Sequence, residues 1–365
     1  MNDVPETPLN ASVNRITLVD LPGVPVDAEV RGQLAYCLLS AEAVLRYAQP
    51  WAEPLQLPAD DAATARLTLP RYIADCVTAP DPHKRAAAEA IAERLGRNLG
   101  YLLLTLRRGD AVNRAARPDW GVPEWARWGR MQRVWLGGGL AQGAFGARLI
   151  AHARALLAQW DALPLLQLEL TYFGGHLAVV GAARYLPATT TRALCCDFGH
   201  TLVKRAWVTL HGGVLVGLDP LPPVPVPCLW RNYVNAAPEL DGAWVRDFVA
   251  DTVAQALAES PPRGASTPVL LSIAAYIYQG QLHGNGLYAR MQALAPDVGA
   301  LLEQALAARG WPGLSVALLH DGAAAASVYA GERDAAVLML GTALGVGFPP
   351  PTAAGLRPLA AELTF

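Results

Sequence analysis

The chain has 365 residues, of which 53% are hydrophobic and 16% are charged. This composition supplies enough apolar surface for one large domain or two lobes, and it excludes an intrinsically disordered protein. The 29 basic and 31 acidic residues give a formal net charge of -2 and are mixed along the chain. Nucleic-acid binding is therefore disfavoured, because no basic block is present to follow a phosphate backbone.

The sequence predicts a protein of a reducing, aqueous compartment. The N-terminus, MNDVPETPLN, is polar and acidic, whereas a signal peptide begins with positive charge followed by an apolar stretch. No apolar run reaches about 18 residues, the length that a membrane-spanning helix needs. These two features predict a cytoplasmic location. The cysteines are odd in number and form no C-x-x-C pair, so we expect them to be reduced core thiols. They are Cys37, Cys76, Cys195, Cys196 and Cys228.

The first half of the chain predicts long helices around a short buried strand. Asp81 is suited to cap the first helix, and Gly109 follows its last turn. Three glycines end the strand, and this succession of strand, glycine turn and helix is typical of α/β proteins. A stretch without periodicity predicts an irregular excursion. The predicted elements are helices over 82–106, 144–160 and 175–185, a strand over 133–136 and the excursion over 109–128.

The second half alternates strands with helices. A three-stranded antiparallel meander turns at Gly212 and Gly213. The proline-rich residues after it predict a loop, because proline does not pair inside a central strand. The predicted elements are strands over 193–196, 202–210, 214–218, 268–273, 314–319 and 335–340, helices over 242–259, 286–309 and 322–330, and a loop over 220–227.

The turn after the first strand of the meander has the residues of a phosphate site. Residues 197–201 read DFGHT, and Lys204 lies three residues further. Gly199 permits a turn whose N–H groups point into one concavity, and the Thr201 hydroxyl adds a donor. The Asp197 carboxylate is a ligand of the kind that Mg²⁺ prefers. An ordinary Asp-Gly hairpin turn explains the same residues, so both interpretations stay open on this motif alone.

Two further glycine turns follow buried strands. Residues 341–347 read GTALGVG, and facing the first turn they would clamp the phosphates of a nucleotide. Residues 137–139 are all glycine, but the dinucleotide-binding pattern G-x-G-x-x-G fails at Gln142. The P-loop motif G-x-x-x-x-G-K-[ST] does not occur either. Glycines at this place would still let an adenine or ribose lie against the backbone.

A fourth candidate is the sequence His320-Asp321-Gly322, where a buried strand ends and a small-residue helix begins. A carboxylate there can accept the proton of a substrate hydroxyl, which is the role of the base in kinases. A helix N-cap is the more frequent reason for an Asp at such a place. Asn285, in the turn HGNG, is a candidate substrate contact, although turn asparagines are commonly structural.

Together these segments resemble the ROK proteins (repressors, open reading frames and kinases), a group within the actin-like ATPase and sugar kinase superfamily. DFGHTLVK resembles the first phosphate motif of the family, D-x-G-G-T-x-x-K. LLHDGAAAASVYAG resembles its motif N-D-x-x-A-A-A-x-x-E-x-x-G, and VLMLGTALGVG resembles its second phosphate motif, L-G-T-G-x-G-x-G. RVWLGGGLAQGAFGARLIAHARALL resembles its adenosine motif.

The order of the motifs differs from that of the family, in which the adenosine motif comes last. Here residues from about 80 to 190 resemble the family's C-terminal portion and those from about 190 to 348 its N-terminal portion. This is the order of a circular permutation, which is tolerated where chain ends lie close together. The resemblance implies an α/β protein with a two-lobed, circularly permuted actin-like ATPase (ribonuclease H-like) fold. The expected domains are a nucleotide-binding lobe over 1–186, a lobe with the first phosphate motif and substrate contacts over 187–320, and a return to the nucleotide-binding lobe over 321–365.

The resemblance also implies roles for single residues. Asp321 would be the general base, His320 a substrate contact, and Asp197 the carboxylate associated with Mg²⁺. Contacts to ATP would come from Gly137, Gly138, Gly139, Asp197, Gly199, His200, Thr201, Lys204, Gly341, Thr342 and Gly345. The chain departs from the family at His200, His320, Tyr329 and Ala343, and it lacks the family's E-x-G-H sugar motif and cysteine-rich zinc motif.

These features favour an ATP- and Mg²⁺-dependent kinase of a small molecule, with a sugar or sugar derivative as the implied acceptor. A non-catalytic protein that binds nucleotide or sugar stays open, because the altered positions His200, His320 and Ala343 would permit it. A kinase of another acceptor such as pantothenate also stays open, since the D-x-G-N-T turn of such kinases is near DFGHT. The expected partner is a small molecule rather than nucleic acid or a membrane, and a homodimer is left open.

Overall fold

The computed structural model describes residues 11–57, 62–161, 164, 166–227, 240–260, 267–284 and 286–364, without the side chains of residues 62–67. It is a mixed α/β protein whose chain forms two compact units. We call residues 176–332 with 347–364 the meander unit, and residues 11–175 with 333–346 the long-helix unit. The bounds of these units differ from the expected domain bounds. Residues 176–186, 321–332 and 347–364, which were expected in the nucleotide-binding lobe, belong to the meander unit.

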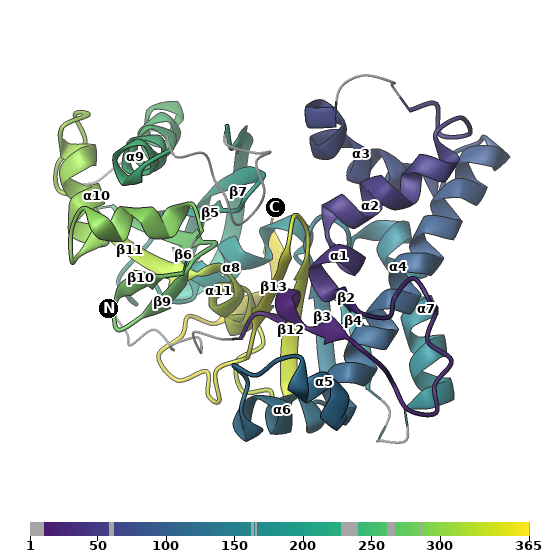
Figure 1. Ribbon diagram of the computed structural model, residues 1–365. Coiled ribbons are helices and arrows are strands. Elements are labelled where there is room, and N and C mark those ends of the chain that lie inside the picture. The colour runs from purple at the N-terminus through teal and green to yellow at the C-terminus, as the bar shows by residue number, and fades with distance from the viewer. Residues whose placement is uncertain are drawn as a thin grey trace. The chain divides into compact units, whose positions relative to one another are not determined.

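The meander unit is built on a six-stranded sheet in the order β11-β8-β5-β6-β7-β14 (Figure 1). As predicted from the glycine turns, β5, β6 and β7 are consecutive antiparallel neighbours. On the other side of β5, β8 and β11 run parallel to it. The strands are β5 (Arg192–Phe198), β6 (Leu202–His211), β7 (Val214–Pro225), β8 (Pro268–Ile273), β11 (Ser315–His320) and β14 (Leu359–Thr364), and a separate pair is formed by β9 (Tyr276–Tyr278) and β10 (Gln281–His283).

Helices cover both faces of this sheet. Leu194, Cys196 and Phe198 share one hydrophobic core with residues of α9 and α10. Because side chains alternate along a strand, the residues between them face the other side, where α8 packs on β5 and α11 packs on α8. The backbones of α8 and α11 nearly touch, since a Cβ on Gly181 would lie 1.7 Å from the Ala324 carbonyl oxygen. The helices are α8 (Leu177–Ala183), α9 (Gly242–Glu259), α10 (Val298–Ala307) and α11 (Asp321–Ser327), with the 3-10 helices η3 (Gly174–His176) and η4 (Tyr288–Ala293).

The predicted loop over 220–227 is wrong, because β7 continues to Pro225. Strand β14 pairs with β7 at Leu215 and Gly217, and among the described residues no strand pairs with the later residues of β7 on that edge, so no N–H is needed there. Pro222 and Pro223 also fall within a register shift against β6. Proline is therefore tolerated in this strand, which the sequence alone did not show.

Two other expectations are corrected by the structure. Residues 286–309 are not one helix, since η4 ends before Pro296 and Asp297 caps a new helix, α10, by accepting a hydrogen bond from the Ala300 N–H at 3.0 Å. The excursion over 109–128 contains two short helices, α5 (Ala111–Ala115) and α6 (Val122–Gly129). The second begins with a local cap, in which the Glu124 carboxylate accepts from the Gly121 N–H at 2.8 Å.

The long-helix unit contains a four-stranded sheet in the order β13-β12-β3-β4, in which β12, β3 and β4 are parallel. Its longest helix, α4, begins and ends as predicted: the Asp81 side chain accepts from the N–H groups of His83 and Lys84, and Gly109 adopts a left-handed conformation after the last turn. The strands are β1 (Thr17–Leu18), β2 (Gln33–Leu34), β3 (Arg133–Gly137), β4 (Gln167–Leu170), β12 (Ala335–Leu340) and β13 (Leu344–Gly347). The remaining elements are α1 (Ala35–Leu39), α2 (Ala41–Ala48), α3 (Ala62–Cys76), α4 (Pro82–Arg108), α7 (Gly143–Trp160), and the 3-10 helices η1 (Val13–Arg15) and η2 (Gln49–Trp51).

Four cysteines lie in the described ranges, and all four are free. Burial raises the pKa of the Cys196 thiol to about 12, and that of Cys195 is raised as well. Cys228 lies outside the described residues. In the part of the chain that the structure describes, no helix combines the length and the apolarity needed to cross a bilayer.

Candidate functional site

Asp197 lies near the C-terminal end of β5 and is fixed by both neighbouring strands. In the register of the sheet it is opposite Lys204 of β6 and Ser272 of β8. The Lys204 ammonium group lies 3.1 Å from Asp197 Oδ2, and the Ser272 hydroxyl donates to Oδ1 at 2.8 Å. The Asp197 side chain is only 7% exposed. A charged lysine and a hydroxyl thus compensate a carboxylate that is almost fully removed from water.

His320 and Asp321 lie at the corresponding end of β11, where α11 begins. The His320 ring caps the helix, because its Nδ1 accepts a hydrogen bond from the Ala323 N–H at 3.2 Å. Burial lowers the pKa of His320 to about 4, so the ring is neutral at pH 7. With Nδ1 as the acceptor, the ring proton sits on Nε2, which lies 3.2 Å from Asp321 Oδ1. The Tyr276 ring stacks on the imidazole at 4.9 Å and fixes its plane.

The pKa of Asp321 is raised to about 7, first by burial and then by the negative charge of Asp197. The Gly322 N–H, which donates to Asp321 at 2.7 Å, and the Lys204 ammonium oppose this rise. The side chain nevertheless keeps 28% of its surface exposed. A reachable carboxylate whose pKa is near neutral pH suits general-base catalysis, because it can both take up and release a proton under working conditions.

The turn between β5 and β6 holds the other residues of the first predicted motif. The Tyr288 hydroxyl donates to the Gly199 carbonyl at 2.7 Å and anchors the turn. The ring of His200 lies 6.5 Å from that of Tyr288. Burial lowers the pKa of His200 to about 4, so this residue adds no positive charge to the turn at neutral pH.

Within the long-helix unit, the two other predicted turns lie side by side. They follow β3 and β12, which are parallel neighbours. Gly138 has a φ of +89°, and a Cβ there would lie 2.3 Å from the Leu340 carbonyl oxygen, so the two backbones touch. A Cβ on Gly139, by contrast, would meet no atom within 4 Å. Gly139 therefore leaves open space of the kind that a flat ligand needs.

The turn after β12 is held by residues that sequence reasoning left unassigned. The buried Asn14 side chain accepts from the Leu344 N–H at 2.8 Å and donates to its carbonyl at 2.7 Å. The Ala41 N–H donates to the Gly341 carbonyl at 2.8 Å. Both contacts join residues about 300 positions or more apart in sequence, and no local pattern marks them.

Three residues near the Asp197 pair also lacked a sequence signal. Ser272 is recognised only from the strand register, and Tyr276 only from its stacking on His320. His176 lies close enough to Asp197 and Lys204 for their charges to change the pKa of its ring. Its pKa is lowered first by burial and then by Lys204, and Asp197 opposes this.

The predicted site residues fall into two groups. The meander unit contains Asp197, Gly199, His200, Thr201, Lys204, His320 and Asp321, and the long-helix unit contains Gly137, Gly138, Gly139, Gly341, Thr342 and Gly345. Asn285 lies outside the described residues.

The described ranges contain no cluster of three His, Cys, Asp or Glu side chains that could hold a metal ion. Mg²⁺ commonly binds through one or two carboxylates together with substrate phosphates. Lys204 donates to one Asp197 oxygen and Ser272 to the other, and each oxygen has a second lone pair, so this carboxylate fits that mode.

Comparison with known proteins does not assign this site, since no protein-family model and no curated protein matches the chain.

Proposed function

We propose that the protein is an ATP-dependent phosphotransferase that phosphorylates a hydroxyl group of a small molecule, with a sugar or sugar derivative as the acceptor class. The observation that carries this proposal is Asp321, a partly exposed carboxyl with a pKa of about 7. It lies at the same edge of the parallel strands as the Asp197–Lys204 ion pair. The sugar itself rests on the motif likeness.

The strand order supports the finer proposal about the fold. Three antiparallel strands, β7-β6-β5, are extended by the parallel strands β8 and β11. This order is one that the proposed ribonuclease H-like lobe would have, and the second sheet, with its parallel core β12-β3-β4, is compatible with a related lobe. The strand that begins the first sheet comes late in the chain, at residue 192, as a circular permutation requires.

The proposed reaction needs little covalent chemistry from the protein. The acceptor oxygen attacks the γ-phosphorus of ATP, its proton passes to Asp321, and the bond to the leaving ADP oxygen breaks. His320 positions the base by donating Nε2–H to it, and the Tyr276 ring holds His320 in place. Bound Mg²⁺ would supply neutralisation of the phosphate charge. The glycine turns would contact the nucleotide through backbone N–H groups, as helix and turn N–H groups do in other phosphate sites.

A coupled assay of ATP consumption over a panel of sugars, with pantothenate included, tests the proposal. Asp321→Asn should lower kcat by about 10²- to 10⁴-fold on the active acceptor, because general-base catalysis contributes this much. Asp219→Asn is the matched control, since Asp219 is an exposed carboxylate of the same unit. Turnover that is unchanged in Asp321→Asn would sink the assignment of the base.

One observation favours a second candidate, a protein that binds nucleotide or sugar without turnover. His200 occupies the position of a glycine in the family motif and is neutral at pH 7 because burial lowers its pKa to about 4. It fills space in the phosphate turn without adding charge. Calorimetric binding of Mg-ATP together with no turnover on any acceptor would favour this candidate.

A further inference from the structure

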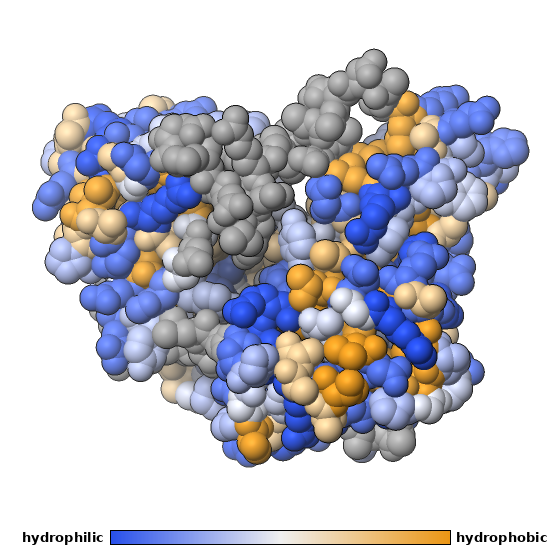
Figure 2. Space-filling model, in the orientation of Figure 1, coloured by the Kyte–Doolittle hydropathy of each residue, from blue (hydrophilic) through white to orange (hydrophobic). Residues whose placement is uncertain are grey.

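The long-helix unit has a cavity of about 510 Å³ that is not part of the site described above. It lies against α2, η2 and α4, and the residues that matter for its chemistry are Glu29, Arg46, Tyr47, Trp51, Ile91 and Arg94. Its volume is in the range of about 300–1,000 Å³ that small-molecule sites have. In Figure 2, the surface over α2 carries strongly hydrophilic residues directly beside hydrophobic ones.

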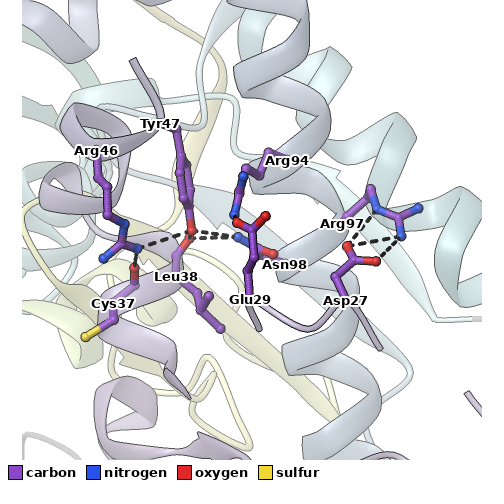
Figure 3. A network of polar contacts seen from close by, with 9 residues as sticks. All are labelled: Asp27, Glu29, Cys37, Leu38, Arg46, Tyr47, Arg94, Arg97 and Asn98. Carbon is purple, nitrogen blue, oxygen red and sulfur yellow. Dashed lines mark hydrogen bonds and ion pairs between the residues drawn. The ribbon is translucent and has the colours of Figure 1, made fainter. Parts of the chain in front are cut away.

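Tyr47 forms a rigid platform in this cavity. The residue is only 6% exposed. The buried Asn98 amide donates to the Tyr47 hydroxyl at 2.9 Å, and this hydroxyl donates to the Leu38 carbonyl at 3.2 Å. These two bonds fix the hydroxyl end of the buried side chain, and so they hold the ring in one position (Figure 3).

The guanidinium groups of two arginines lie over the Tyr47 ring. The guanidinium carbon of Arg94 lies 4.5 Å from the ring centroid, and that of Arg46 lies 5.3 Å from it. Figure 3 shows Tyr47 between the two side chains. Attraction between each cation and the ring electrons holds two positive groups beside one cavity.

Arg46 and Arg94 each use only part of their N–H donors for the hydrogen bonds within the described residues. Arg46 uses Nη2 for the Cys37 carbonyl and the Tyr47 hydroxyl, and Arg94 uses Nη2 for Glu29. Within the described residues, the Nε–H and Nη1 groups of these two arginines make no hydrogen bond. Two planar sets of N–H donors are therefore available, and such donors fit carboxylate and phosphate oxygens.

The neighbouring arginine on α4 is different. Arg97 donates through both Nε and Nη2 to Asp27, at 3.4 Å and 3.0 Å. It lines the two smaller cavities of about 200 and 180 Å³ that adjoin the same helix. The Asp27 carboxylate thus already binds two of the donor groups of Arg97. Among these three cavities, only the larger one is lined by both Arg46 and Arg94.

We propose that this cavity binds a small organic anion in which a carboxylate or phosphate group is joined to a flat apolar body. Arg46 and Arg94 receive the anionic group, and the body packs against Trp51 and Ile91. Glu29, which holds Arg94, competes with the ligand for that arginine. The site is independent of the proposed phosphotransfer.

Isothermal titration calorimetry of the full chain with phenyl phosphate, which carries both required groups, tests the site. Arg46→Gln and Arg94→Gln should each weaken binding by about tenfold, the value of one charge-assisted hydrogen bond. Glu29→Gln should tighten binding several-fold, because it frees the Arg94 donors. Arg97→Gln, a loss of the same charge on the same helix, should leave binding unchanged.

The opposite signs expected for Glu29→Gln and the arginine variants separate ligand binding from a purely structural role. Binding that persists in the double variant Arg46→Gln/Arg94→Gln, with its circular dichroism unchanged, would locate the phosphate on another site and overturn the proposal. Absence of any binding by the wild type would also overturn it, as would equal affinity for inorganic phosphate, because the apolar wall would then contribute nothing. If the arginine variants fail to fold, Glu29→Gln decides alone: unchanged or weaker binding would overturn the proposal.

Discussion

His320 and Asp321 are adjacent in sequence and have complementary environments. Burial makes the imidazole neutral and leaves it one donor, Nε2–H, which faces the carboxyl group of Asp321. Burial and the charge of Asp197 make the carboxyl group harder to ionise. The result is a base whose orientation is set by a helix cap, since the same imidazole accepts from the Ala323 N–H. A side chain that caps α11 in this way also fixes where the base points.

The raised pKa of Asp321 predicts how stability depends on pH. The folded value of about 7 exceeds the value of about 4 expected in an unfolded chain. The folded protein then binds the proton more tightly, so this residue's contribution falls as the pH rises from about 4 to about 7. Asp321→Asn should therefore be more stable than the wild type at pH 8, by at least about 1 kcal/mol, and equally stable near pH 4.

Urea unfolding over this pH range measures the difference. Asp219→Asn, at an exposed position of the same unit, controls for the loss of one surface charge. A difference between Asp321→Asn and the wild type that does not change between pH 4 and pH 8 would contradict the raised pKa.

At the scale of elements, the contact between the turn after β3 and the end of β12 depends on one glycine. Gly138 adopts a positive φ and lies against the Leu340 carbonyl, whereas the next residue, Gly139, faces open space. Two adjacent glycines therefore serve different purposes, one in packing and one in leaving room. The motif GGG does not reveal which is which.

Substitution of these two glycines separates the purposes. Gly138→Ala should lower the free energy of unfolding by about 2 kcal/mol or more, because a Cβ at a positive φ is strained and would also meet the Leu340 carbonyl. Gly139→Ala should leave stability within about 0.5 kcal/mol and weaken nucleotide binding if the adenosine assignment is right. Chemical unfolding and calorimetry measure the two effects, and equal stability of the two variants would refute the distinction.

At the scale of the whole molecule, each unit is assembled from separate stretches of chain. The chain passes from one unit to the other after residues 175, 332 and 346. Residues 333–346 supply β12 and most of β13 to the long-helix unit, and the chain then returns to add β14 to the meander unit. Both sheets therefore need late residues before they are complete.

A ligand that binds only the folded protein stabilises it by mass action. Mg-ATP at about 100 times its Kd should raise the free energy of unfolding by about 2.7 kcal/mol. Urea titrations with Mg-ATP, compared with the same concentration of MgCl₂ alone, measure this. No shift at any nucleotide concentration would contradict nucleotide binding, and with it the proposed function.

Local signals were sufficient for many elements. Asp81 and Gly109 define the ends of α4 because capping depends on residues within one turn. The predicted bounds of β8, β12 and α9 agree with the structure. The glycine motifs likewise mark turns after buried strands, and the sequence also indicates the candidate residues at the ends of β5 and β11.

Only the tertiary structure decided what those residues contact. Ser272 reaches Asp197, and Asn14 reaches Leu344, through pairings between segments far apart in the chain. Strand β7 includes its proline-rich residues because β14 does not pair with that part of it. The pKa of Asp321 depends on burial and on the charge of Asp197. Sequence by itself determined many of the elements and their chemical groups, since these depend on neighbours along the chain. Burial, register and charge compensation depend on neighbours in space, and for this reason the structure alone provided them.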